Sequence, residues 1–279
     1  MPCPSSLPNP ISAHLASLQL APPSQPHPSI FFDPPSTNST THAQTVLTPI
    51  CEKAIDFVHA LLPSWGKNHV YRTYAVGLAV ADHAGWTIAP KSEELGWDRE
   101  AWFLAAILHD IGWDQQENLK SRLSFEIYGG VKAREILMGW GASQDIADEV
   151  CESTVRHTDF GATTGSIRLM TALVQIGAGH DLLGFAVPHF LHPEDSRMIN
   201  ERWPRLGIAQ QLTHDLQDEL KHKPGCIASK WEADVIRGNM IGIECYKGLE
   251  GEPTDDPEWK ERRKTVAVDT YGYRQISKT

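Results

Sequence analysis

The chain has 279 residues, of which 41% are hydrophobic, so it is long enough and apolar enough to bury a sizeable core. Its 25 Lys and Arg residues against 35 Asp and Glu residues give a formal net charge of -10, which argues against the basic stripe of a nucleic-acid-binding protein and against affinity for anionic membranes. We therefore expect a small molecule as partner, with neither nucleic acid nor a membrane.

The chain divides into three parts by composition. Residues 1–48 are rich in Pro, Ser, Thr and His and nearly uncharged, which predicts a flexible tail without a long helix. This tail lacks the pattern of a signal or transit peptide, and the sequence has no apolar run of membrane-spanning length, so we expect a cytoplasmic protein. Residues 49–231 form the predicted domain, and residues 232–279 are a charged C-terminal extension, of which we expect residues 250–279 to be an exposed tail.

Apolar residues recur with helical period through residues 49–231, while alternation typical of strands is nearly absent. Glycine, proline and capping residues stand where helices would begin or end. We predict an all-α fold in a single domain. The expected helices cover about 50–62, a stretch that begins near Asn68, stretches that begin after Asp98, Ser124, Ser143 and Ser166, and the segments at about 194–203 and 205–222.

The dipeptide His109-Asp110 ends an otherwise apolar helix, and Gly112 follows it. Neighbouring helical residues diverge by about 100°, so both side chains reach one point only where the helix ends. A buried carboxylate beside a buried imidazole is costly unless a cation compensates, and these donors suit zinc, iron, manganese or nickel. A hydrogen-bonded pair that caps the helix is the alternative.

Three further polar positions lie at predicted helix ends. His69 begins the second helix, His157 ends the fifth, and His180-Asp181 ends the sixth. The order of His69, His109-Asp110 and Asp181 on successive helices resembles the HD superfamily of metal-dependent hydrolases. The resemblance implies an HD-type helical domain in which these four residues hold one divalent transition metal at helix ends. Zn²⁺ is the first choice, ahead of Fe²⁺, Mn²⁺ and Ni²⁺.

A narrower resemblance rests on several short segments between about His69 and Cys226. It points to the fungal cyanamide hydratases, which add water to cyanamide to give urea. It implies a metal-dependent lyase of the hydro-lyase type that acts on cyanamide or on a related small nitrile-like compound. The segments are Glu117-Asn118-Leu119, the run from Leu123 to Gly130, the run from Cys151 to Asp159, and Lys223-Pro224-Gly225-Cys226.

Four residues near these segments are candidates for work on the substrate. His157 and Glu126 are candidate catalytic residues that relay protons, although a helix-end cation and a helix-start carboxylate are also favoured by the helix dipole. Asn118 and Lys120 follow the metal pair in a loop and are candidate substrate-binding residues. Trp113 occupies a position where many HD phosphohydrolases carry lysine, which favours a small neutral substrate.

Three other functions remain open from the sequence. A mononuclear HD phosphohydrolase acting on a nucleotide would use the same metal ligands together with a cationic cluster for phosphate. A dinuclear HD oxygenase would need more histidines between His109 and Asp181, and a metal-free scaffold would leave the site empty. The sequence does not say whether the chain forms a homo-oligomer. The candidate phosphate-binding cations are Arg72, Lys120, Arg122 and Arg156.

Overall fold

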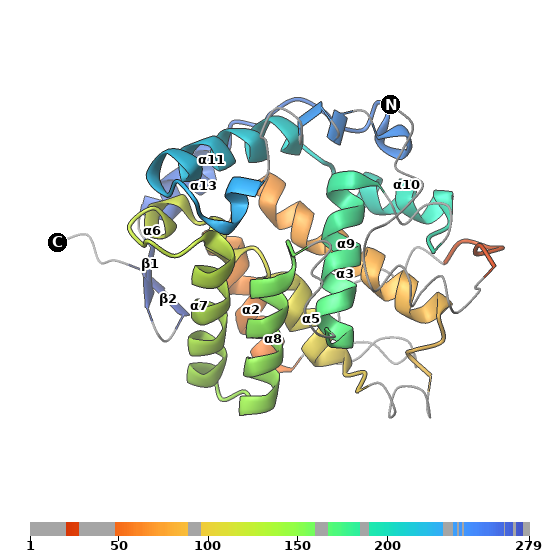
Figure 1. Ribbon diagram of the computed structural model, residues 1–279, viewed down its shortest axis with the longest axis horizontal. Coiled ribbons are helices and arrows are strands. Elements are labelled where there is room, and N and C mark those ends of the chain that lie inside the picture. The colour runs from red at the N-terminus through yellow and green to blue at the C-terminus, as the bar shows by residue number, and fades with distance from the viewer. Residues whose placement is uncertain are drawn as a thin grey trace.

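A computed structural model describes residues 21–27, 48–88, 96–159, 167–184, 190–230, 237–238, 240–241, 243–264, 266–269 and 272–275. Over these residues the chain is a bundle of helices (Figure 1), and the predicted all-α fold is confirmed. The strands of the described chain are β1 (Val266–Asp269) and β2 (Gly272–Gln275), which pair antiparallel as a short hairpin near the C-terminus. No helix in this part of the chain has both the length and the apolar character needed to cross a bilayer.

The helices follow the predicted order closely. The second one starts at Ser64, earlier than expected, and Pro63 occupies its N-cap position. Ser166, the predicted cap of the sixth, lies outside the described residues, and that helix follows Arg168. The longer helices are α2 (Pro49–Leu61), α3 (Ser64–His83), α5 (Arg99–Leu108), α7 (Phe125–Trp140), α8 (Gln144–Arg156), α9 (Leu169–Leu183), α10 (Pro193–Arg202), α11 (Ile208–His222) and α13 (Pro257–Lys264). Short helical turns are η2 (Ile111–Trp113), α6 (Gln115–Asn118), η3 (Ile227–Lys230) and η4 (Glu244–Tyr246).

Local capping explains several of these boundaries. The carboxylate of Asp98 accepts a hydrogen bond from the backbone of Ala101 at 2.7 Å, and the Ser143 hydroxyl accepts one from Ile146 at 3.3 Å. At the C-terminal end of α7, Gly141 adopts a φ of 92°, in the left-handed region that favours glycine. These contacts span only three or four residues, so the sequence is enough to predict them.

The main hydrophobic core lies between α2, α3, α5, α7, α8 and α9. Helix α3 runs alongside α9, and a Cβ at Gly177 of α9 would overlap the backbone of Thr73 on α3. A Cβ at Gly112 would likewise overlap the Phe125 carbonyl at the start of α7. These two close approaches bring the ends of α5, α7 and α9 together beside α3, and the candidate site lies there.

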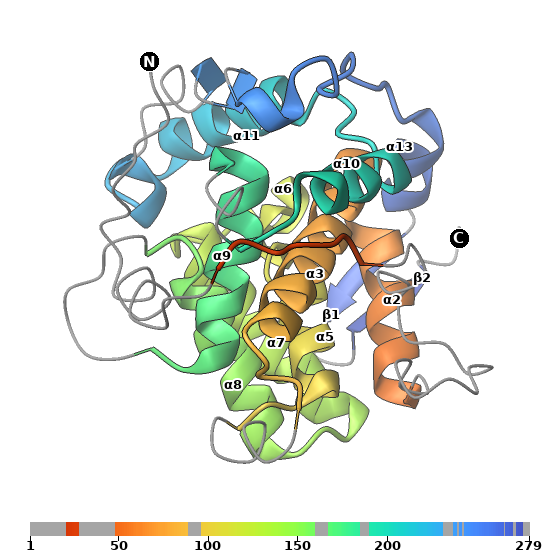
Figure 2. The same cartoon turned by 90° about the vertical axis from the view of Figure 1, so that its right-hand side faces the viewer.

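Residues 21–27 cross the surface beside α3 and α10 (Figure 2), so this stretch of the predicted flexible tail is attached to the domain. The backbone N–H of His27 donates to Asp195 at 2.8 Å, and the imidazole contacts Asp195 at 3.0 Å and Asp82 at 3.3 Å. A fully buried carboxylate at Asp195 needs such donors, and the tail supplies them.

Residues 250–264 of the expected exposed tail are mostly exposed, but several of their side chains contact the domain. Asp256 accepts a hydrogen bond from the backbone of Ser64 at 3.1 Å, and the Trp259 indole donates to the Leu61 carbonyl at 3.1 Å. Arg263, which is 1% exposed, pairs with Asp114. Residues with charged side chains can pack inward when each charge meets a partner, and here the partners lie more than a hundred residues away in the sequence.

Candidate metal centre

His109 and Asp110 lie where helix α5 gives way to η2. His109 keeps helical backbone angles, whereas Asp110 has a φ of -108° and a ψ of 14°. This change of direction lets adjacent side chains converge, as the sequence predicts for a helix end. His69 projects toward them from inside α3 rather than from its first residue. All three side chains are buried.

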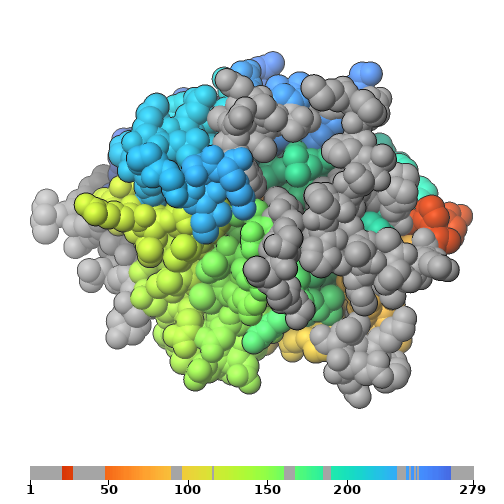
Figure 3. All heavy atoms as spheres, in the orientation of Figure 1, coloured from red at the N-terminus to blue at the C-terminus, as the bar shows by residue number. Residues whose placement is uncertain are grey.

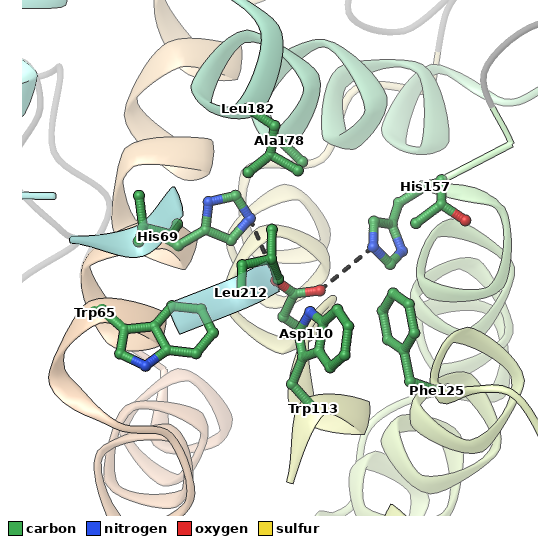
Figure 4. Close-up of a pocket in the computed structure, with 11 residues that line it drawn as sticks. Trp65, His69, Asp110, Trp113, Phe125, His157, Ala178, Leu182 and Leu212 are labelled. Atoms are coloured by element: carbon green, nitrogen blue, oxygen red, sulfur yellow. Dashed lines mark ion pairs between the residues drawn. The ribbon is translucent and has the colours of Figure 1, made fainter. Parts of the chain in front are cut away.

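The side chains meet around the carboxylate of Asp110. Its Oδ2 atom lies 3.3 Å from Nε2 of His69 and 3.4 Å from Nε2 of His109, and these two nitrogen atoms are 3.3 Å apart. Its Oδ1 atom lies 3.3 Å from Nε2 of His157. Figure 4 shows the imidazoles of His69 and His157 on opposite sides of Asp110.

The outer nitrogen of each imidazole faces a hydrogen-bond acceptor. Nδ1 of His109 donates to the Ala106 carbonyl at 2.8 Å, and Nδ1 of His157 donates to the Thr154 carbonyl at 2.6 Å. Nδ1 of His69 donates to Asp181 at 2.6 Å. Each ring, when neutral, therefore carries its proton on Nδ1 and directs an Nε2 lone pair toward Asp110.

With the rings neutral, several acceptors converge without a proton between them, and a metal cation satisfies that arrangement. His69, His109 and Asp110 each offer one ligand atom, and these atoms all lie within 4.8 Å of one another. Imidazole nitrogen and carboxylate oxygen are ligands for zinc and related transition metals. The three residues fit a divalent metal, and bonds from Nδ1 to a carbonyl or carboxylate are the outer contacts usual for metal-binding histidines.

Burial and charge act differently on the three ligand candidates. Burial lowers the pKa of His109 to about 3, which keeps its imidazole neutral and able to bind a metal. Burial also lowers the pKa of His69, but hydrogen bonds from this ring to Asp110 and Asp181 outweigh it and raise the pKa. The Asp110 carboxyl has a pKa well below its usual range, because the surrounding histidines outweigh the effect of burial.

Asp181, the fourth ligand implied by the sequence resemblance, lies behind His69 and outside the cluster of His69, His109 and Asp110. Its carboxylate accepts hydrogen bonds from Arg72 at 2.7 and 2.8 Å and from Arg205 at 2.7 Å. These arginines outweigh burial and hold the pKa of Asp181 well below its usual range. In this arrangement the Asp181 carboxylate contacts His69 on the side of the ring away from Asp110.

Both candidate catalytic residues are next to Thr158: His157 precedes it in the chain, and Glu126 contacts its side chain. His157 faces Asp110, as described above, and its ring packs edge-on against Phe125 with ring centroids 5.7 Å apart. Glu126 is fully buried, and its Oε1 atom accepts a hydrogen bond from the Thr158 hydroxyl at 2.8 Å. Its Oε2 atom has no hydrogen-bond partner among the described residues. Glu126 therefore reaches the site through Thr158.

The two candidate substrate-binding residues do not line the cavity of the site. Asn118 is buried between Glu219, to which it donates at 3.1 Å, and Lys223, from which it accepts at 2.5 Å. Lys120 is exposed and pairs with Glu117 at 2.9 Å. The expectation that they contact substrate followed from their nearness in sequence to His109-Asp110, and the structure turns both side chains elsewhere.

A small cavity that is partly open to solvent lies over the cluster. His69, Asp110, His157 and Thr158 line it together with a majority of apolar side chains. Trp65 is one of these wall residues, and Trp113 stacks on Phe125 with centroids 4.1 Å apart. The remaining wall residues are Ala178, Leu182, Ile208 and Leu212.

Two arginines of the site were not predicted in their actual role. Arg72 was a candidate for phosphate, yet its position three residues after His69 on one helix was a usable signal that both serve the same site. Arg205 carried no such signal, because 24 residues that include helix α10 separate it from Asp181. Thr158 lay inside a segment already singled out, but its hydroxyl contact with Glu126 is long-range.

Comparison with known proteins gives two findings. The HD domain family model matches residues 67–207, which include the three clustered residues, His157 and Asp181. Cyanamide hydratases DDI2 and DDI3 of Saccharomyces cerevisiae are each 33% identical to this chain over 105 residues, which is 37% of this chain and 46% of each relative. The matched region thus spans about half the length of these curated relatives.

Proposed function

Because the chain belongs to the HD domain family, we propose that it is a metal-dependent hydro-lyase that adds water to cyanamide or to a related small nitrile-like compound. The similarity to two cyanamide hydratases supports the reaction, and the apolar cavity supports a small uncharged substrate. We also propose that the protein is cytoplasmic, as expected from the sequence.

The observation that carries the proposal is the set of Nε2 lone pairs directed at Asp110 within a buried cavity. His69, His109 and Asp110 would hold a divalent cation, with Zn²⁺ as the first choice for this donor set. Such a cation supplies Lewis acidity and lowers the pKa of water at the site toward neutrality. Asp181 holds the imidazole of His69 in orientation from behind.

His157 is the candidate for proton transfer. Its Nε2 atom faces the cluster, while its Nδ1 proton is held by the Thr154 carbonyl, so Nε2 can accept a proton from the attacking water. The water oxygen bonds to the nitrile carbon, and the proton taken by His157 passes to the nitrile nitrogen. This addition gives an imidic acid or isourea, which becomes the amide or urea when the remaining O–H proton moves to the same nitrogen, so both hydrogens of water end on the product. Glu126 acts through the Thr158 hydroxyl to orient groups at this end of the cavity.

The alternative, a phosphohydrolase acting on a nucleotide, requires cations at the cavity. Arg72 pairs with Asp181, Lys120 with Glu117 and Arg156 with Glu152, while Arg122 is exposed. None of these four residues is part of the cavity wall over the described chain. The geometry therefore favours the hydratase.

The test combines metal analysis with a substrate panel. Purified full-length protein would be analysed for bound metals and then assayed with cyanamide, simple nitriles and nucleotides. We expect about one equivalent of a divalent transition metal and urea formation from cyanamide. Turnover of a nucleotide in the absence of any hydration would replace the hydratase by the phosphohydrolase.

A further inference from the structure

We infer that the preferred substrate carries a short hydrocarbon substituent beside its nitrile group, as in an N-alkylated cyanamide, and that cyanamide itself is the poorer substrate. The inference rests on the proposed hydratase function and refines its substrate. It comes from the side chains that surround the metal cluster rather than from the cluster itself.

The wall of the cavity is continuous with a small hydrophobic cluster separate from the main core. Trp65, Trp113, Phe125, Leu182, Ile208 and Leu212 belong to both the wall and this cluster, and each is no more than 7% exposed. In Figure 4, Trp113 and Phe125 stand below Asp110 and Leu182 stands above it, so apolar surfaces flank the reacting position. A group attached to the nitrile carbon would contact hydrocarbon on these sides.

The polar lining residues are already engaged. His69 and Asp110 belong to the proposed metal site, and His157 to proton transfer. The Thr158 hydroxyl donates to Glu126, and the Thr158 carbonyl accepts from Lys230 at 2.8 Å. The amino group of cyanamide would therefore give up its hydrogen bonds to water for a mostly apolar wall, at a cost that an alkylated nitrogen avoids.

The charges of the cavity wall also favour a substrate with an uncharged substituent. Over the described part of the chain, the cavity wall includes no Lys or Arg, and its one acidic member, Asp110, belongs to the metal cluster. Lys230 reaches the rim through the Thr158 carbonyl without joining the wall. An anionic substituent directed along this wall, away from the metal cluster, would lose its hydration without meeting a Lys or Arg side chain of the described wall.

Two wall residues come from α11, which lies beyond the segment that matches the HD domain. Ile208 and Leu212 are 0% and 4% exposed and face the cluster from this helix. Figure 3 shows atoms of α9 in a hollow beside α11 on the face viewed there. The hydrocarbon wall is therefore completed by an element added to the HD domain, and substrate preference can be changed there without altering the metal residues.

The test compares kcat/KM for three nitriles with full-length, metal-loaded protein: cyanamide, N,N-dimethylcyanamide and the anionic cyanoacetate. A well-fitted methyl group in an apolar pocket raises discrimination by about 10- to 200-fold, so we expect at least about a tenfold preference for dimethylcyanamide over cyanamide. Cyanoacetate should be the poorest of the three. Product ureas and amides are quantified by chromatography.

Two leucines of α11 provide a matched pair of variants. Leu212 lines the cavity, whereas Leu216, one turn later, is buried in the same hydrophobic cluster without lining it. Leu212→Ala should lower the ratio of kcat/KM for dimethylcyanamide to that for cyanamide about tenfold. Leu216→Ala should leave that ratio unchanged. The ratio is independent of the fraction of folded enzyme, so loss of stability in either variant does not obscure the result.

The outcomes separate the inference from the proposed function. Hydration of cyanamide in preference to dimethylcyanamide, or equal changes of the ratio in both variants, overturns the inference and leaves the hydratase standing. Turnover of cyanoacetate at the rate of dimethylcyanamide also overturns it. If the metal-loaded protein hydrates none of the three nitriles, the proposed function itself fails.

Discussion

The Nδ1 atom of His69 lies 2.6 Å from Oδ2 of Asp181, so the carboxylate stands behind the imidazole, on the side opposite Nε2. This contact sets the tautomer of His69, because a ring that donates from Nδ1 keeps its Nε2 lone pair for a metal. Arg72 and Arg205 hold the carboxylate in turn. We therefore propose that Asp181 positions His69, whereas the sequence resemblance implies that Asp181 is itself a ligand.

The first prediction distinguishes those two roles. In Asp181→Asn the metal should bind about 10- to 100-fold more weakly, the usual effect of losing an outer-shell partner, yet still reach one equivalent at saturation. With Co²⁺ in place of the native metal, the visible absorption bands should keep their positions, since the inner ligands are unchanged. A shifted spectrum would make Asp181 a ligand. Circular dichroism shows whether the unmatched charges of Arg72 and Arg205 impair folding.

The second prediction concerns the inner ligands. His109→Ala and Asp110→Ala should each abolish stable metal binding, because each removes one of the three clustered ligand atoms. Metal content is measured by elemental analysis after dialysis. His214→Ala, which removes a largely exposed imidazole from α11, is the control and should retain its metal. Full occupancy in both cluster variants would show that the metal binds elsewhere.

Much of the fold can be predicted from the sequence because the signals are local. The caps of α5 and α8 at Asp98 and Ser143 each involve a contact three residues away. The glycine that follows His109-Asp110 also marks a real change in backbone direction. Apolar periodicity then places the intervening helices without knowledge of their neighbours.

The partners of the site residues could not be predicted in the same way. Asp181 and Arg72 are 109 residues apart, and Asn118 meets Glu219 and Lys223 from 101 and 105 residues away. No periodic pattern relates such positions, because their contacts depend on how helices pack. Nearness in sequence to His109-Asp110 therefore gave Asn118 a substrate-binding role that its actual contacts do not support.

The third prediction tests whether the C-terminal extension belongs to the folded unit. Arg263→Ala should lower the free energy of unfolding by about 3–5 kcal/mol, because it leaves the buried Asp114 carboxylate without its partner. Arg197→Ala removes exposed ion pairs with Glu194 and Glu201 and should leave the free energy of unfolding nearly unchanged. Urea denaturation measures both. Equal, small effects would mean that α13 is only loosely attached.

The double variant Asp114→Asn with Arg263→Ala gives a second check. Burial already raises the pKa of Asp114, which shows that the site tolerates the uncharged form better than an unpaired charge. Removing both charges should therefore destabilise the protein less than removing Arg263 alone. A double variant that is less stable than Arg263→Ala would contradict this account.

The fourth prediction concerns pH and the segment 21–27. Burial lowers the pKa of His27, but hydrogen bonds and charges of Asp195 and Asp82 outweigh it and raise the pKa from 6.5 to about 9. A pKa raised by folding means that the protonated ring stabilises the folded state. This contribution is complete below pH 6.5 and is lost as the pH rises through about 9.

His27→Gln should therefore destabilise the protein near about pH 6 and have little effect near about pH 10. Denaturation curves of the wild type and the variant at both values give the two differences in the free energy of unfolding. Metal content should be the same in both proteins, since His27 lies outside the cluster. A destabilisation that does not change with pH would assign the contact to packing rather than to charge.

The last prediction separates His157 from the metal ligands. Its Nε2 atom lies 3.3 Å from Oδ1 of Asp110, whereas His69 and His109 approach Oδ2, so His157 borders the metal cluster from the side of the cavity. His157→Ala should bind metal normally and hydrate the preferred nitrile roughly a hundredfold or more slowly, the scale expected for a lost general acid–base group. Elemental analysis and the hydration assay are run on the same preparation.

Loss of metal together with activity would make His157 a ligand and favour a second metal, while unchanged activity would leave it as a cation at the end of α8. Loss of turnover with full metal content is the expected result, because the proton on Nδ1 is fixed by Thr154 and the free Nε2 lone pair faces the position where water must be deprotonated.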